Sequence, residues 1–89
     1  MFTVACTQAA LDELAFVWVS SDTKTRNQIT AATTLLDRHL RANAPRLGES
    51  RDDEDFRLLI VEPIGIEFLV SEEDRLVTVF RAWRLSPLS

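Results

Sequence analysis

The chain has 89 residues, a hydrophobic content of 46% and a formal net charge of −4. This length suits one compact domain over residues 1–89 and excludes a second. Cys6 is the sole cysteine, which excludes an internal disulfide and a multi-cysteine metal site. No apolar run reaches the roughly 18 residues of a membrane span. The N-terminus lacks a signal-peptide pattern, so we predict a cytoplasmic protein.

The charge is divided unevenly along the chain. Residues 1–51 carry a net charge of +1 and residues 52–89 a net charge of −5. Nucleic-acid binders usually display clustered basic charge, because much of their affinity comes from phosphate contacts. Here basic residues cluster only around the end of the second predicted helix, which argues against a nucleic-acid substrate.

The first half of the chain predicts a short strand and two helices. Alternation over residues 2–6 predicts the strand, with Cys6 as a small buried side chain. Thr7 can cap a helix over 8–19, whose apolar stripe is Leu11, Leu14, Ala15 and Trp18, with Trp18 in the core. Capping residues at 20–22 precede a second helix over 23–43, with an apolar stripe of Ile29, Ala32, Leu36 and Leu40.

The second half predicts a three-stranded antiparallel meander. Residues 45–55 form an exposed loop. The run 56–61 is apolar on both sides, which predicts a central strand, and a type I turn over Glu62-Pro63-Ile64-Gly65 follows. Strands over 66–70 and 75–85 flank a polar turn at 71–74. The predicted fold is α+β, in the order β-α-α-β-β-β, with a helical hairpin on one face of a small, mainly antiparallel sheet. The pattern does not indicate where the first strand pairs.

Several stretches carry a resemblance to the RelE/ParE superfamily of bacterial toxins. They are residues 10–18 in the first helix, 45–51 in the loop, 56–59 entering the sheet and 74–83 in the last strand. The resemblance implies a toxin-like component of a type II toxin-antitoxin system, with an antitoxin protein as partner and a role such as plasmid stabilisation. RelE-like members cleave messenger RNA on the ribosome, whereas ParE-like members inhibit DNA gyrase.

The resemblance also assigns candidate catalytic residues. Arg57 and Arg84 match basic positions of the family on the first and last meander strands, where they would stabilise transition-state charge. Gly65-Ile66-Glu67 stands where the family has an arginine, and the chain has no tyrosine. Arginine, with a pKa above about 12, is a poor acid or base near neutral pH. The residue set therefore favours protein binding of the gyrase type over RNA cleavage.

Other basic and aromatic residues are candidates for partner binding. They are Arg38, Arg41, Arg46, Arg51, Arg81 and Trp83. Each has a structural alternative: the first two can stabilise a helix C-terminus, Trp83 can pack on the core, and Arg57 can pair with the acidic loop. Two glycines exclude a glycine-rich phosphate loop, and His39 has no metal-ligand partners at a recognisable spacing, so no cofactor and no metal are predicted.

Three functional hypotheses follow from the sequence. The first is a toxin-like protein that binds an antitoxin and acts on a protein target such as gyrase. The second is a ribosome-dependent ribonuclease. The third is an inactive binding protein with the toxin fold that forms homo-oligomers.

Overall fold

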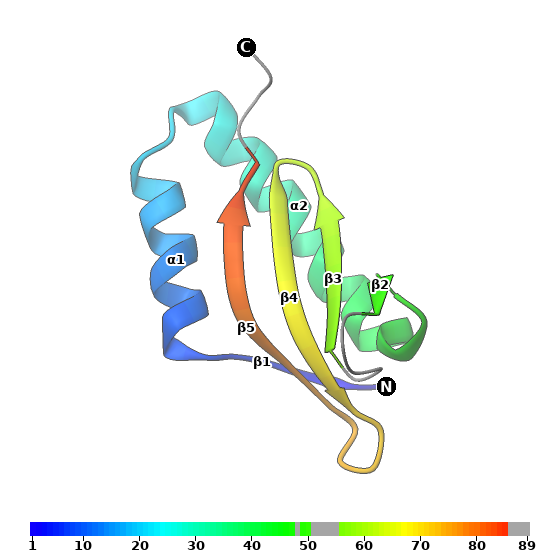
Figure 1. Ribbon diagram of the computed structural model, residues 1–89. Helices are drawn as coiled ribbons and strands as arrows, with labels where there is room; N and C mark the ends of the chain where they lie inside the picture. The colour runs from blue at the N-terminus through cyan, green and yellow to red at the C-terminus, as the bar shows by residue number, and fades with distance from the viewer. Residues whose placement is uncertain (48, 51–55, 86–89) are drawn as a thin grey trace.

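The computed structural model describes residues 1–47, 49–50 and 56–85. Two helices and a short 3-10 helix accompany a five-stranded sheet (Figure 1). In chain order the elements are β1 (Thr3–Cys6), α1 (Gln8–Val19), α2 (Thr23–Asn43), η1 (Ala44–Arg46), β2 (Glu49–Ser50), β3 (Phe56–Val61), β4 (Ile64–Ser71) and β5 (Leu76–Arg84). The predicted α+β class and the order of the main elements are confirmed, and both helices have the predicted bounds.

The strands lie in the order β1-β5-β4-β3-β2. The meander β3-β4-β5 is antiparallel, whereas β1 pairs with β5 in parallel, from Thr3 opposite Leu76 to Cys6 opposite Val79. The two-residue strand β2 pairs with β3 inside the stretch predicted as an exposed loop. The run 56–61 was predicted to be a central strand, and β3 does lie between two strands, β4 and β2, although β2 pairs with only Arg57 and Leu58. The residues of β3 are apolar on both sides because the sheet face without helices is itself apolar.

The first hairpin turn also differs from the prediction. Val61 pairs directly with Ile64, so the two-residue turn is Glu62-Pro63, with a cis peptide bond between them. A type I turn over 62–65 is therefore wrong, and Gly65 belongs to β4. The second hairpin turn follows Ser71 and ends at Arg75, whose φ of 54° lies in the left-handed region.

Helix α2 packs as its pattern predicts. Its four stripe residues are at most 4% exposed and contact the core strands. At its start the Asp22 side chain accepts a hydrogen bond from the backbone N–H of Thr25 at 2.8 Å. Thr7 caps α1 in the same way, accepting from Ala10 N–H at 3.1 Å. Side-chain caps of this kind satisfy N–H groups that have no partner within the helix.

Helix α1 is rotated relative to its predicted orientation. Ala10 is fully buried and Leu14 and Val17 pack against the core, whereas Leu11 is 47% and Trp18 40% exposed. The core assignment of Trp18 is therefore wrong. The reason is tertiary: α1 lies along β5, near one side of the sheet (Figure 1), so only a narrow strip of its surface meets the core.

Arg26 of α2 binds the C-terminal end of α1. Its Nε donates to the backbone carbonyl of Trp18 at 2.8 Å, and its guanidinium lies 5.6 Å from the centre of the Trp18 ring. The carbonyls at a helix C-terminus lack partners within the helix, and a cation there is also attracted to the negative end of the helix dipole. Trp18 therefore stabilises the helical hairpin from outside the core.

Both helices lie on the same side of the sheet. In Figure 1, α2 crosses behind the strands, α1 runs beside β5, and no helix lies in front. No helix in the described part of the chain is long and apolar enough to cross a membrane. The prediction that one sheet face is covered by helices and the other left free of them is confirmed for the described residues.

Asp22 gives a prediction for the pH dependence of stability. Hydrogen bonds from Thr25, followed by weaker attraction to Arg84 and Lys24, lower the pKa of the Asp22 carboxyl. A lowered folded-state pKa means that the ionised cap stabilises the fold above the unfolded-chain pKa of about 3.9 and that this contribution disappears as pH falls through the folded-state pKa. Wild type should therefore lose more stability between neutral and acidic pH than Asp22→Asn, which caps without titrating.

Urea unfolding of both proteins at neutral and acidic pH measures this difference. Glu72→Gln, on the exposed β4–β5 turn, is the matched control. Parallel pH profiles for wild type and Asp22→Asn would contradict the assignment.

Candidate functional site: the open sheet face

Strand alternation defines a continuous surface on the side of the sheet without helices. In β4 the side chains of Ile64, Ile66, Phe68 and Val70 are buried toward the helices, so the residues between them point the other way. The register extends this surface across β3 and β5. We call it the open face; its larger side chains are Phe56, Leu58, Ile60, Glu67, Leu69, Phe80, Arg81 and Trp83.

The open face is largely apolar. Phe56 and Ile60 are 38% and 46% exposed, and the rings of Phe56 and Phe80 meet edge to face with centroids 5.4 Å apart. A register shift between Glu67 and Phe68 inserts Phe80 as an extra residue in β5, which brings both Phe80 and Arg81 to this side. Contiguous apolar surface of this kind is typical of interaction sites.

The Trp83 indole lies close to the backbone of Gly65, its register partner in β4. A Cβ added at Gly65 would be 2.6–2.8 Å from three atoms of the indole ring. The glycine is thus required for close approach of the ring. Trp83 therefore packs on the open face and not among the side chains between sheet and helices.

Glu67 and Arg81 are the charged side chains among the described residues of the open face, and they are register partners on β4 and β5. Glu67 is half-buried and forms no ion pair with a described residue. Arg81 contacts Glu13 of α1 instead, with Nε 3.6 Å from Oε2. The arrangement places one carboxylate and one guanidinium side by side within an apolar surface.

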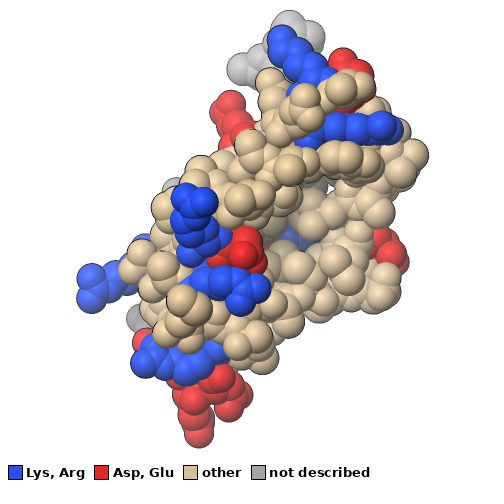
Figure 2. Space-filling view, turned by 180° about the vertical axis from the view of Figure 1, so that it is seen from behind, with Lys and Arg blue, Asp and Glu red and all other residues tan. Residues whose placement is uncertain are grey.

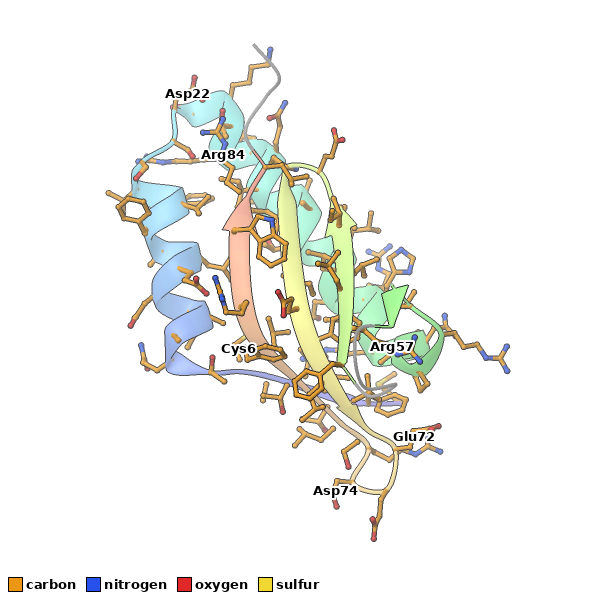
Figure 3. The ribbon with its side chains drawn as sticks, in the orientation of Figure 1. Cys6, Asp22, Arg57, Glu72, Asp74 and Arg84 are labelled. Atoms are coloured by element: carbon orange, nitrogen blue, oxygen red, sulfur yellow. The ribbon has the colours of Figure 1, made fainter. Side chains whose placement is uncertain are left out.

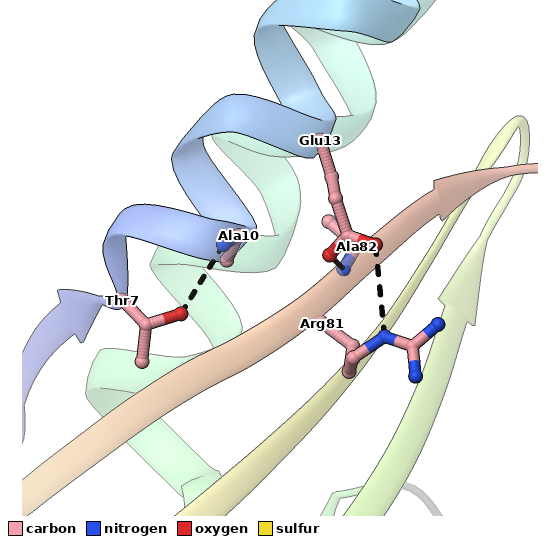
Figure 4. Close-up of polar contacts among 5 residues, drawn as sticks. All are labelled: Thr7, Ala10, Glu13, Arg81 and Ala82. Atoms are coloured by element: carbon pink, nitrogen blue, oxygen red, sulfur yellow. Dashed lines mark hydrogen bonds and ion pairs between the residues drawn. The ribbon is translucent and has the colours of Figure 1, made fainter.

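Glu13 is a structural residue that the sequence pattern did not reveal. Its Oε1 accepts a hydrogen bond from the backbone N–H of Ala82 at 3.1 Å, and its Oε2 faces Arg81 (Figure 4). Strand β1 pairs with β5 only as far as Val79, so the edge of β5 beyond that point needs another acceptor. The signal is tertiary, because Glu13 and Ala82 are 69 residues apart.

We expect Glu13→Ala to lower the free energy of unfolding by about 1–3 kcal/mol, because it leaves the partly buried N–H of Ala82 without an acceptor. Glu13→Gln keeps an acceptor oxygen and should recover most of the loss. Asp12→Ala, at the neighbouring exposed position, is the control and should change stability by less than about 0.5 kcal/mol. Equal losses for Glu13→Ala and Asp12→Ala in urea unfolding would contradict this role.

The two residues proposed to stabilise transition-state charge lie far apart. Figure 3 shows Arg57 near the start of β3 and Arg84 near Asp22 at the opposite end of the sheet. Arg57 is opposite the buried Phe68 in the register, so it points to the helix side, where its Nη1 donates to the carbonyl of Leu47 at 3.3 Å. The structure therefore does not bring Arg57 and Arg84 into one site.

The proposed partner-binding residues fall into two groups. Arg38, Arg41 and Arg46 lie on α2 and η1, on the helix side, where Lys and Arg side chains are scattered over the surface (Figure 2). Arg41 pairs with Asp37 of the same helix at 2.9 Å, a contact that the sequence pattern did not predict. Arg81 and Trp83 lie on the open face. Arg51 falls outside the described residues.

The helix side has a hollow of its own. A cavity of about 140 Å³ opens between α1, α2 and the sheet, and the helix side is visibly hollowed in Figure 2. Its lining is mainly apolar and includes Val4, Leu14, Leu36, Leu40 and Val79. Cys6 also lines this cavity. The residue is exposed and not buried, so its predicted burial is wrong. Its thiol is still partly shielded from water, and this desolvation, followed by repulsion from Asp37, raises the pKa of the thiol.

Comparison with known proteins shows which fold this is. No protein-family model and no curated protein matches the sequence. Solved structures do match. The chromosomal ParDE toxin-antitoxin system of Pseudomonas aeruginosa has a TM-score of 0.69 at 17% identity, covering 97% of this chain and 98% of the other. The RelBE2 toxin-antitoxin complex of Mycobacterium tuberculosis has a TM-score of 0.75 at 15% identity, covering 97% and 93%.

The isolated Escherichia coli RelE toxin is also similar, with a TM-score of 0.68 at 15% identity over 100% of this chain and 89% of the other. The chain therefore has the RelE/ParE toxin fold, as its sequence resemblance implies. Identities this low establish the fold alone.

Proposed function

We propose that this protein is a toxin-like component of a type II toxin-antitoxin system and that its partner is an antitoxin protein. The proposal is supported by fold: the similar structures include the RelBE2 toxin-antitoxin complex of M. tuberculosis and, besides the isolated RelE toxin, the intact RelBE toxin-antitoxin complex of E. coli. The apolar cavity between α1, α2 and the sheet offers a surface for an apolar antitoxin segment. Leu11 and Trp18 of α1 are exposed and add to the apolar surface of the helix side.

We further propose that the protein acts on a cytoplasmic protein target, of the DNA gyrase type, and does not cleave RNA. The observation that supports this mode is the chemistry of the open face. Cleavage by a 2′-hydroxyl needs a base, an acid and positive charge for the transition state. The described open face supplies one carboxylate and one guanidinium among apolar side chains, so a full set of proton-transfer groups is not assembled there.

The experiment is expression of the protein in a bacterial host with and without the open reading frame that neighbours its gene, where a toxin-antitoxin pair would have the antitoxin. The proposal expects growth arrest that the neighbouring frame relieves. It also expects the purified protein to inhibit supercoiling by purified gyrase while messenger RNA on ribosomes stays intact. Growth arrest that the neighbouring frame relieves, with neither gyrase inhibition nor cleavage of messenger RNA, would support the toxin-antitoxin assignment and refute the gyrase target.

Ribonuclease activity is the second candidate, and one observation favours it: Glu67 and Arg81 are neighbours on the open face. A carboxylate beside a guanidinium could act as the base for a 2′-hydroxyl while the cation stabilises the phosphate. Under this hypothesis Glu67→Gln abolishes ribosome-dependent cleavage, whereas Glu72→Gln on the exposed turn leaves it unchanged. Intact messenger RNA in the presence of wild-type protein rules it out.

A further inference from the structure

We propose that the open face is the interface of a symmetric dimer, in which Glu67 of each copy pairs with Arg81 of the other. The inference does not depend on toxin activity, because its occupant is a second copy of this chain. The open face combines exposed aromatic and aliphatic side chains with the carboxylate of Glu67, which has no ion pair among the described residues.

The charges of the open face are self-complementary. A two-fold interface brings the same patch of both molecules together, so a patch carrying one sign of charge repels itself. Glu67 and Arg81 stand directly opposite one another on adjacent strands. A two-fold axis running between β4 and β5, parallel to the strands, places each Glu67 over the second copy's Arg81. Two equivalent ion pairs then form at the centre of the interface.

Arg81 is free to make this contact. Its side chain is 59% exposed, and its contact with Glu13 uses Nε at 3.6 Å, a long distance for a charge-assisted hydrogen bond. The terminal nitrogens can therefore reach a second carboxylate without loss of the first. Glu67 gains a cation that no described side chain of its own copy provides.

The apolar residues of the open face suit the same arrangement. The axis keeps the strands of the two sheets aligned, as in sheets that pack face to face at an angle of about 30°. Phe56, Phe80, Leu58 and Leu69 surround the charged pair, and their burial excludes water from it. A nucleic-acid occupant is disfavoured because Glu67 would repel phosphate.

A target that bound the open face would compete with the second copy for the same surface. The proposal therefore predicts that the monomer is the form that meets such a target. It also predicts that self-association depends on protein concentration, which a measurement on the purified chain alone can test.

The test is sedimentation equilibrium of the full chain from about 1 µM to about 1 mM. Wild type should form dimers within this range. Glu67→Arg and Arg81→Glu should each weaken dimerisation at least about thirtyfold, because each places like charges in contact at a buried centre. The double variant, with both charges exchanged, should recover most of the wild-type affinity.

Two further variants distinguish a loss of dimerisation from a loss of folding. Ile60→Lys changes an exposed position on the open face and should also weaken the dimer, while circular dichroism stays that of the wild type. Glu72→Arg, the same charge reversal on the distant β4–β5 turn, should leave dimerisation unchanged. A monomeric wild type at every concentration, or a double variant no better than the single ones, would overturn the proposal.

Discussion

Phe68→Ala is expected to lower the free energy of unfolding by about 3–5 kcal/mol. Phe68 is 0% exposed at the middle of β4, the central strand, and belongs to the cluster that includes Leu36 and Val79. Truncation removes the ring from the core and leaves a cavity. Strand β4 is paired on both sides and cannot move in to close it. Domains of this size are only marginally stable, so much of the variant should be unfolded at 37 °C.

Urea unfolding followed by circular dichroism measures the effect. Phe16→Ala is the matched control, because the same ring is removed at a position that is 73% exposed. Its effect should stay within about 0.5 kcal/mol. Similar losses at the two positions would show that β4 is not the centre of the core.

Gly65→Ala is expected to destabilise the protein by about 1–3 kcal/mol through overpacking, although it adds only one methyl group. The new Cβ would lie 2.6–2.8 Å from the Trp83 indole, closer than non-bonded atoms tolerate. The ring must move off the backbone of β4 into solvent. Alanine at this buried position therefore changes the open face as well as stability.

The clash can be isolated by a double-mutant cycle. Trp83→Leu removes the indole, so Gly65→Ala made in that background should cost much less than in wild type. Tryptophan fluorescence of Gly65→Ala should shift to longer wavelength as Trp83 meets water. A Gly65→Ala cost that is unchanged by Trp83→Leu would place the strain in the backbone and not at the ring.

The candidate site was only partly accessible from sequence. Arg81 and Trp83 are predicted candidates for partner binding, and both lie on the open face. Arg57 was assigned by resemblance, and its strand position is correct, but its side chain points toward the helices and bonds Leu47. Which face a residue occupies depends on strand register, and a shift of one residue exchanges the faces.

Sequence alone determined the local order of the chain. The bounds of α1 and α2, the stripe of α2 and the meander were predictable because caps, periodicity and turn residues act within a few positions of one another. Helix α2 lies across the sheet, so its apolar stripe and its buried face coincide. The sequence resemblance and this order together indicated the fold that the similar structures show.

Tertiary structure decided everything that depends on distant contacts. Periodicity in α1 identified an apolar stripe but not which side would face the core, since Trp18 packs under Arg26 while Ala10 is buried. The parallel pairing of β1, the acceptor that Glu13 supplies to β5 and the separation of Arg57 from Arg84 arise from segments that meet only after folding. Such contacts leave no periodic signal, because each of them joins positions whose spacing in the chain is arbitrary.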